Sequence, residues 1–243
     1  MYKVKKAIII AAGMGERLRP VTWETPKPLV KVKGVSMIET EISALHKNGI
    51  NEIYIVVGYL KEKFNIISEK YPKITLIDNP YAAYCNNISS LYCAKEHLNE
   101  DVIILDGDLL IRNSDILSPE FQRSGYNCIQ RTEQNNEWTI DTDENGIVSE
   151  CNIGGCGQWQ LYGISRWCKD DAEKLKYFLE IEFEEKKNIQ KFWDELALFN
   201  YRTEFQLGVR EIQKADVTEI DNLDELIALD KSYLRFRLSR GHI

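Results

Sequence analysis

Several basic side chains follow a pair of glycines near the start of the chain. Gly13 and Gly15 come directly after an apolar run, and Arg17, Arg19 and Lys27 follow within one loop. Glycines at such a turn let backbone N–H groups approach an oligophosphate without a Cβ atom in the way. Prolines at positions 20, 26 and 28 prevent a regular helix that would turn the basic side chains aside. The loop is therefore expected to bind a triphosphate.

Two better-known phosphate-binding loops fit this stretch poorly. A dinucleotide-binding turn has a third glycine where this chain has Leu18, and it opens a long helix. A P-loop has Gly-Lys-Ser/Thr where this chain has Leu18-Arg19-Pro20. A turn without function would leave the three basic residues of the loop unexplained.

Acidic residues stand at two distant places. Asp106 and Asp108 follow the apolar run 102–105, and Glu219 and Asp221 lie in the segment TEIDNLDEL. Side chains alternate along a strand, so only one of the first two is expected to point into a cleft. Asp221 or Asn222 could instead cap a helix at residues 223–229. Hard carboxylate oxygens of this kind suit Mg²⁺.

Tryptophans are concentrated in the second half of the chain. Four of the five lie between positions 138 and 193, and Trp193 is followed by Asp194 and Glu195. An aromatic face beside a carboxylate suits a quaternary ammonium group, at about 0.5–2 kcal/mol per cation–π contact. Core packing is the usual role of a single tryptophan. Trp159 and Tyr162 lie on opposite faces of an expected strand, so at most one should line a pocket.

The first half of the chain alternates between apolar runs and helical patterns. Runs rich in Ile and Val occupy residues 7–11, 52–57, 74–77 and 102–105, and their continuous apolarity predicts parallel strands buried on both faces. Ser36 and Glu39 form a capping-box signature before one helix, and Asn48-Gly49 ends it. Two further helices are expected at residues 61–70 and 89–98. This order predicts a doubly wound, mostly parallel, Rossmann-like α/β sheet with ligands at the carboxyl ends of its strands.

The second half has a different pattern. Residues 126–166 read as short strands broken by turns, which predicts an antiparallel insertion at the open edge of the sheet. Helices are expected at residues 170–187 and 189–200, a strand at 207–209 and a terminal helix at 223–229. The chain is treated as one domain: a nucleotide-binding part (about 1–125), an acceptor-binding insertion with helices (about 126–205) and a metal-completing segment (about 206–243).

Composition bounds the class of protein. The chain has 243 residues and a net charge of −7, which argues against nucleic acid as the main partner. No stretch approaches the ~20 apolar residues of a membrane span, and the N-terminus lacks the features of an export signal. The six cysteines are expected to be reduced thiols; a zinc site formed by Cys151 and Cys156 lacks a second ligand pair. A cytoplasmic enzyme is expected.

The opening loop resembles the signature of the nucleotidyltransferases that activate sugar 1-phosphates and phosphocholine, G-x-G-x-R-L-x-P-x-T-x(3)-P-K-x-L. The matching positions are Gly13, Gly15, Arg17, Leu18, Pro20, Thr22, Pro26, Lys27 and Leu29. The resemblance implies that Arg17 contacts the β- and γ-phosphates, and that Lys27 contacts the α-phosphate and the acceptor phosphate. Both would act as catalytic cations where charge accumulates.

Four further segments resemble the phosphocholine cytidylyltransferase branch of this family. They are PYAAYCNNISSLYCAKEHL (80–98), NEW (136–138), FWDEL (192–196) and the late EID. The resemblance implies a nucleotide site made by Ala11, Ala12, Gly13, Met14, Gly15, Asn87, Ser89 and Ser90. It implies an acceptor site at Trp138, Tyr162, Trp193 and Asp194, and a Mg²⁺ site at Asp108, Glu219 and Asp221, with Asp106 structural. Leu109, where some relatives have a polar residue, and the glycine-rich turn 154–157 depart from the branch.

The resemblance thus predicts a Mg²⁺-dependent transferase that forms CDP-choline and pyrophosphate from CTP and phosphocholine. One alternative keeps the chemistry but uses 2-aminoethylphosphonate, phosphoethanolamine, another phosphorylated small amine or a sugar 1-phosphate. A non-catalytic nucleotide sensor is a more remote alternative, because Arg17, Lys27, Asp108 and Asp221 are all retained. A dinucleotide dehydrogenase is disfavoured by Leu18. Base preference and oligomeric state are left open.

Overall fold

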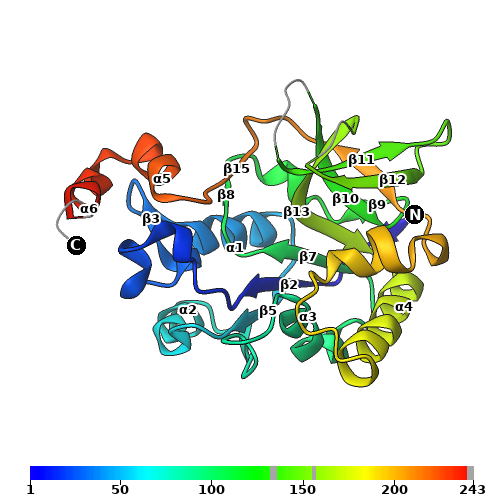
Figure 1. Cartoon of the computed structure of the whole chain (residues 1–243), viewed down its shortest axis with the longest axis horizontal. Helices are drawn as coiled ribbons and strands as arrows, with labels where there is room; N and C mark the ends of the chain where they lie inside the picture. The colour runs from blue at the N-terminus through cyan, green and yellow to red at the C-terminus, as the bar shows by residue number, and fades with distance from the viewer. Residues whose placement is uncertain (132–135, 155–156, 240–243) are drawn as a thin grey trace.

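The structure, a computed structural model, describes residues 1–131, 136–154 and 157–239. At its centre, parallel strands lie side by side in the order β7-β2-β5-β6 (Figure 1). Their bounds are Val102–Asp106 (β7), Lys6–Ala11 (β2), Glu52–Val57 (β5) and Ile74–Asp78 (β6). Every residue of β2 is buried, as expected for a strand covered on both faces. The four predicted parallel strands are confirmed.

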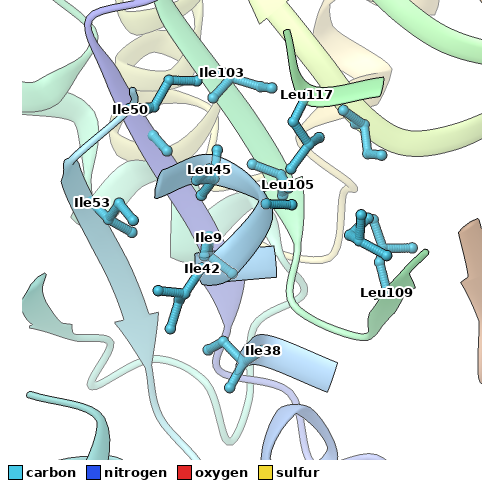
Figure 2. Packing of buried hydrophobic residues seen from close by; sticks show 14 of the residues in the cluster. Ile9, Ile38, Ile42, Leu45, Ile50, Ile53, Ile103, Leu105, Leu109 and Leu117 are labelled. Atoms are coloured by element: carbon cyan, nitrogen blue, oxygen red, sulfur yellow. The ribbon is translucent and has the colours of Figure 1, made fainter. Parts of the chain in front are cut away.

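Helices cover both faces of this sheet. One face is packed by α1 (Met37–Lys47) and α2 (Asn65–Lys70), and the other by α3 (Ile88–Cys93) and α4 (Lys169–Glu180). Figure 2 shows the α1 stripe of Ile38, Ile42 and Leu45 against the strand residues Ile9 and Leu105. The doubly wound α/β class predicted from the sequence is therefore confirmed.

Local signals define the ends of α1. The Ser36 hydroxyl donates to Glu39 Oε2 at 2.6 Å, and the Ser36 backbone N–H donates to the same oxygen at 3.2 Å, which completes the capping box. Gly49, just past the helix, has φ +75°, a conformation that glycine adopts without strain.

The sheet is extended by antiparallel strands beside β7. Strand β13 (Trp159–Trp167) pairs with β7 and carries β10 (Gly125–Gln130) and β11 (Trp138–Thr142). Strand β12 (Val148–Ile153) pairs with β11, and β14 (Gly208–Glu211) adds to β10 in parallel. This is the predicted antiparallel insertion. Gly155 and Cys156 lie outside the described residues. They belong to the glycine-rich turn 154–157, and Cys156 is one of the two cysteines considered for a zinc site.

Helix lengths in the second half were predicted less well. The segment expected as one helix at 170–187 is α4 followed by a π-helical turn, Ile181–Glu185. The helix expected at 189–200 is wrong for its first half, since regular helical structure begins only at Asp194 and continues as the π-helical turn Leu196–Asn200. Lys187 has φ +57°, outside the helical region, and the residues after it form isolated turn bonds and bonds to neighbouring segments instead of a helix. Similarly, α3 ends at Cys93 and a short 3₁₀ turn, Lys95–His97, completes the segment expected to be helical through position 98.

The C-terminal segment returns to the sheet from a distance. Strand β15 (Val217–Glu219) pairs antiparallel with β8 (Leu109–Ile111), so Glu219 lies opposite Leu109. The helices α5 (Leu223–Leu229) and α6 (Leu234–Ser239) follow at the end of the molecule opposite β11 and β12 (Figure 1). Short pairs join β1 (Tyr2–Lys3) to β9 (Glu120–Phe121) and β3 (Lys31–Val32) to β4 (Val35–Ser36). Within the described residues, no helix has both the length and the apolarity needed to cross a bilayer.

Candidate active site

A cavity of about 900 Å³ lies at the carboxyl ends of the parallel strands. The ends of β2 and β7 and Asn79, just beyond β6, all contribute to its wall, which is where a doubly wound sheet binds its ligands. Most of the predicted site residues line it: Ala11, Ala12, Gly13, Met14, Gly15, Arg17, Lys27, Asn87, Ser89, Ser90, Asp108, Trp138, Asp194, Glu219 and Asp221.

The opening loop holds its lysine against its glycine. Gly15 has φ +60°, and a Cβ atom there would stand 2.9 Å from Lys27 Cβ, so a side chain at this position would displace the lysine. The Thr22 hydroxyl donates to the Gly15 carbonyl at 2.8 Å. The prolines limit the loop to short 3₁₀ turns, as expected. These contacts give the Lys27 ammonium a defined position.

Lys27 is the centre of a charge cluster built from three parts of the chain. Its Nζ lies 2.5 Å from Asp108 Oδ2 and 3.2 Å from Asp221 Oδ1, and Arg17 Nη2 lies 2.6 Å from the same Asp221 oxygen. Burial acts to lower the pKa of Lys27, but the charges and hydrogen bond of its carboxylate neighbours outweigh burial and raise the pKa above its ordinary value. The ammonium therefore stays charged, while Arg17 is mostly exposed and free to move towards a ligand.

The acidic members of this cluster fit a divalent cation. Oxygens of Asp108, Glu219 and Asp221 lie within 4.8 Å of one another. Asp108 Oδ1 is buried and forms no hydrogen bond, so one ligand atom is available. Burial, followed by the charges of Asp108 and Asp221, raises the pKa of Glu219 to about 8. A small set of hard carboxylate oxygens suits Mg²⁺.

Asp106 corrects one sequence-based expectation. Both Asp106 and Asp108 line the cavity, although only one of them was expected to. That expectation misapplied strand alternation, because side chains two positions apart share a face. Strand β7 ends at Asp106, and Asp108 lies in the turn beyond Gly107. Room for Asp106 comes from Gly163 on β13, since a Cβ atom there would stand 2.1 Å from Asp106 Oδ2.

Glu41 is a buried acidic residue that sequence reasoning missed. It is fully buried on α1, and its Oε1 accepts a hydrogen bond from the Leu109 backbone N–H at 3.1 Å. Burial, followed by the charge of the nearby Asp108, raises its pKa well above the usual value. Its position three residues after Ile38 and four before Leu45 puts it on the apolar stripe of the helix, which is the signal that could have identified it.

The predicted nucleotide-side hydroxyls belong to a small polar network. Asn79 is buried, and its side-chain amide donates to the hydroxyls of Ser89 and Ser90 at 3.0 Å each. The Asn87 side-chain oxygen accepts a hydrogen bond from the Trp193 backbone N–H at 2.9 Å. The loop before α3 is thereby joined both to β6 and to the segment that carries Asp194.

Trp138 and Phe192 are aromatic side chains that line the cavity. Their ring centroids lie 5.7 Å apart with an edge-to-face angle of 78°. Asp194 lines the same cavity, and burial raises its pKa to about 7. Phe192 and Glu137 were not selected from the sequence, although they open and centre the FWDEL and NEW motifs.

Two predicted acceptor residues lie behind this wall. Trp193 is 3% exposed and packs against Tyr126 and Trp167, with ring centroids 6.4 and 6.1 Å away. Tyr162 is 8% exposed and belongs to the core. Neither is among the residues that line the cavity. The structure therefore brings Trp138 and Asp194 together at the cavity, and places Trp193 and Tyr162 outside it.

Comparisons with known proteins agree with this geometry. A model of the nucleotidyl transferase family matches residues 6–135. The chain is 36% identical over 229 residues to a 2-aminoethylphosphonate cytidylyltransferase of Lancefieldella rimae, covering 94% of this chain and 93% of the relative. It is 34% identical over 226 residues to a choline-phosphate cytidylyltransferase of Streptococcus pneumoniae, covering 93% and 97%.

Solved structures give the same picture. The CTP:phosphocholine cytidylyltransferase of Streptococcus pneumoniae superposes with a TM-score of 0.84 at 33% identity, covering 95% of this chain and 99% of that one. An inositol-1-phosphate CTP transferase of T. maritima superposes with a TM-score of 0.74 at 19% identity, covering 99% and 98%, and shares the fold.

A phosphate loop, a carboxylate cluster and a doubly wound sheet define a nucleotide-transferring enzyme, and the chain belongs to the nucleotidyl transferase family. Within that family its extensive similarity is to cytidylyltransferases.

Proposed function

We propose that this enzyme transfers a cytidylyl group from CTP to the phosphate of phosphocholine, forming CDP-choline and pyrophosphate. The assignment of CTP as the nucleotide is based on the similarity to cytidylyltransferases. The acceptor rests on one observation: the cavity has a buried carboxylate, Asp194, whose charged form is held by no ion pair among the described residues, near the aromatic side chains Trp138 and Phe192. A cationic head group would supply the missing positive charge and use the aromatic faces.

Lys27 and Arg17 would bind the phosphates of the nucleotide. The Lys27 ammonium, held by Asp108 and Asp221, would contact the α-phosphate, where charge accumulates as the acceptor phosphate attacks and pyrophosphate leaves in line. Arg17, with its exposed side chain, can turn from Asp221 to the β- and γ-phosphates. No protein nucleophile is required, so these residues act by positioning the reactants and by electrostatic stabilisation.

Asp108, Glu219 and Asp221 would hold the magnesium ion beside Lys27. When bound, the ion supplies positive charge between two phosphate groups that repel each other by about 4 kcal/mol per charge pair at 4 Å and an effective dielectric of 20. Glu41 would hold the backbone at Leu109 and so keep Asp108 directed at the ion.

2-Aminoethylphosphonate is the second candidate acceptor, and one observation favours it. With Trp193 and Tyr162 behind the wall, Trp138 and Phe192 are the aromatic side chains that line the cavity, while Asp106, Glu137 and Asp194 line it as carboxylates. A primary ammonium gains more from carboxylate hydrogen bonds, and a quaternary one gains more from ring faces.

A competition assay separates the two acceptors. The purified enzyme is incubated with CTP, Mg²⁺ and equimolar phosphocholine and 2-aminoethylphosphonate, with phosphoethanolamine and a sugar 1-phosphate in parallel, and the products are identified by mass spectrometry. CDP-choline as the dominant product supports the proposal. A dominant phosphonate product moves the assignment to the second candidate, and a dominant nucleotide sugar refutes both.

Pyrophosphate release tests whether the chain is a catalyst at all. Turnover that requires Mg²⁺ and an acceptor excludes a nucleotide sensor. CTP binding without pyrophosphate release on any acceptor of the panel would support the sensor instead.

A further inference from the structure

Residues 186–195 form a segment without regular structure until Asp194, and we call it the acceptor strap. It carries Phe192 and Asp194, which line the cavity. Short turn bonds occur within the strap, such as Lys191 N–H to the Asn188 carbonyl at 3.3 Å and Glu195 N–H to the Phe192 carbonyl at 3.2 Å. Because these turns do not form a continuous helix or strand, the position of the strap also depends on the neighbouring segments. Two sets of contacts attach it, one on each side.

On the nucleotide side, the strap lies against the loop before α3. The Asn86 backbone N–H donates to the Ile189 carbonyl at 2.8 Å, and the Gln190 side-chain amide donates to the Tyr84 carbonyl at 2.7 Å. The bond from the Trp193 N–H to the Asn87 side chain completes this side. The strap and the loop before α3 are therefore two adjoining parts of one cavity wall.

On the other side, several side chains of the strap contact one buried carboxylate. Glu182, in the π-helical turn after α4, has a side chain that is 2% exposed. Its Oε2 accepts from Asn188 Nδ2 at 2.6 Å and lies 3.3 Å from Lys191 Nζ; its Oε1 accepts from Lys186 Nζ at 2.8 Å and from the Tyr201 hydroxyl at 2.7 Å.

These partners flank the functional residues of the strap. Lys186, Asn188 and Lys191 precede Phe192 and Asp194, and Tyr201 follows them after the π-helical turn Leu196–Asn200. Tyr201 is itself fixed, because its ring stacks on Phe178 of α4 at 3.8 Å. One carboxylate therefore ties the start and middle of the strap, and Tyr201 beyond its end, to the same point of the scaffold.

Glu182 remains ionised within this network. Burial acts to raise its pKa, but the hydrogen bonds from Lys186, Asn188, Tyr201 and Lys191 outweigh burial and lower the pKa to about 2. Charge-assisted hydrogen bonds are about twice as strong as neutral ones, which makes this carboxylate the strongest attachment of the strap.

We propose that Glu182, which does not line the cavity, is a positioning residue for acceptor specificity: its carboxylate holds the strap so that Phe192 and Asp194 face the cationic head group. The inference rests on the proposed function for the identity of the acceptor. The physical claim is that attachment of the strap controls acceptor affinity separately from nucleotide affinity.

The main test compares Glu182→Gln with Glu184→Gln. Glu184 lies in the same π-helical turn but accepts from Tyr92 and Lys95, away from the strap, so it is a matched control. Losing hydrogen bonds to a charged group is expected to raise the acceptor KM of Glu182→Gln by about tenfold or more. Its KM for CTP and its kcat at saturating acceptor should stay within about twofold of wild type, and Glu184→Gln should match wild type.

Two more measurements separate positioning from general stability. Hydrogen exchange of the strap amides should be faster in Glu182→Gln than in Glu184→Gln, while the amides of β2 and β7 keep wild-type protection. Asn188→Ala removes only one of the contacts and should raise the acceptor KM by a smaller factor, which keeps the test open if Glu182→Gln folds poorly.

The outcomes are distinct. An unchanged acceptor KM in Glu182→Gln, or equal rises in the KM for CTP and for acceptor, overturns the inference. If wild-type enzyme releases no pyrophosphate with any amine acceptor, the proposed function fails, whereas strap exchange in the two glutamate variants still decides whether Glu182 holds the strap.

Discussion

Two regions of the cavity differ in how their carboxylates are paired, although each also contains a carboxyl, Glu219 or Asp194, whose pKa burial raises. Around Lys27, the carboxylates of Asp108 and Asp221 are paired with basic side chains of the same chain. Around Asp194, no ion pair with a lysine or arginine is found among the described residues, and burial raises the pKa of that carboxyl to about 7. This difference supports the proposal that the region around Lys27 binds phosphates and metal, and that the region around Asp194 binds a substrate that brings its own positive charge.

The largest effect should come from the paired region. Asp108→Ala removes a central carboxylate of the cluster, so Mg²⁺-dependent pyrophosphate release is expected to fall by roughly 10³-fold or more. The steady-state rate at saturating CTP and acceptor measures it. Asp115→Ala, an exposed substitution in the same part of the chain, is the control and should keep wild-type turnover. Near-normal turnover of Asp108→Ala would remove the metal site from the proposal.

Lys27→Ala should have the next largest effect. The ammonium acts on charge that develops during the transfer, so kcat should fall roughly 10²–10³-fold while the acceptor KM changes much less. Steady-state kinetics in both substrates separate these parameters. A rise in KM with unchanged kcat would assign Lys27 to ground-state binding alone.

Trp138→Ala probes the region that lacks its own cation. Loss of one aromatic face should raise the acceptor KM by roughly 3- to 30-fold, corresponding to about 0.5–2 kcal/mol, and should leave the KM for CTP near normal. Initial rates with each substrate varied in turn give both constants. Loss of CTP binding would show that the two subsites are wrongly placed.

Asp194 predicts a pH dependence of acceptor binding. Because its pKa is raised from the usual 3.8 to about 7, the group is mostly neutral at pH 6 and mostly charged at pH 8. A cationic head group binds the charged form, so acceptor affinity should rise roughly tenfold over this interval and then level off. Asp194→Asn should lose this dependence. Any pH dependence that remains in this variant reports the ionisation of the acceptor phosphate, and it can be subtracted from the wild-type profile. Equal profiles in the two proteins contradict the prediction.

The smallest functional effect is expected for Trp193→Phe. This side chain packs behind the wall, so the acceptor KM should stay within about twofold while the free energy of unfolding falls by about 1–2 kcal/mol from the lost volume. Thermal unfolding and the acceptor KM measure the two quantities. A large rise in KM without loss of stability would return Trp193 to the acceptor site, as the motif alone suggested.

Much of the nucleotide half could be predicted because its signals are local. Buried strands appear as continuous apolar runs, and the capping box and Asn48-Gly49 mark the ends of α1. Helical periodicity failed at residues 189–193 because several polar groups of that segment bond to residues far away in sequence: the Ile189 carbonyl accepts from the Asn86 N–H, and the Trp193 N–H donates to the Asn87 side chain. The orientation of Asp106 was missed because the expectation misapplied strand alternation, which places residues two positions apart on the same face.

The sequence by itself determined the doubly wound order, the basic glycine loop and the residue types of the two charged regions, since each depends on neighbours within a few positions. Only the tertiary structure decided which distant side chains meet. Pairing of β15 with β8 brings Asp221 to Lys27, and packing of the insertion turns Trp193 inward while leaving Trp138 and Asp194 at the cavity. The physical reason is that the direction of a side chain follows from its backbone and packing partners, and these partners lie far away in sequence.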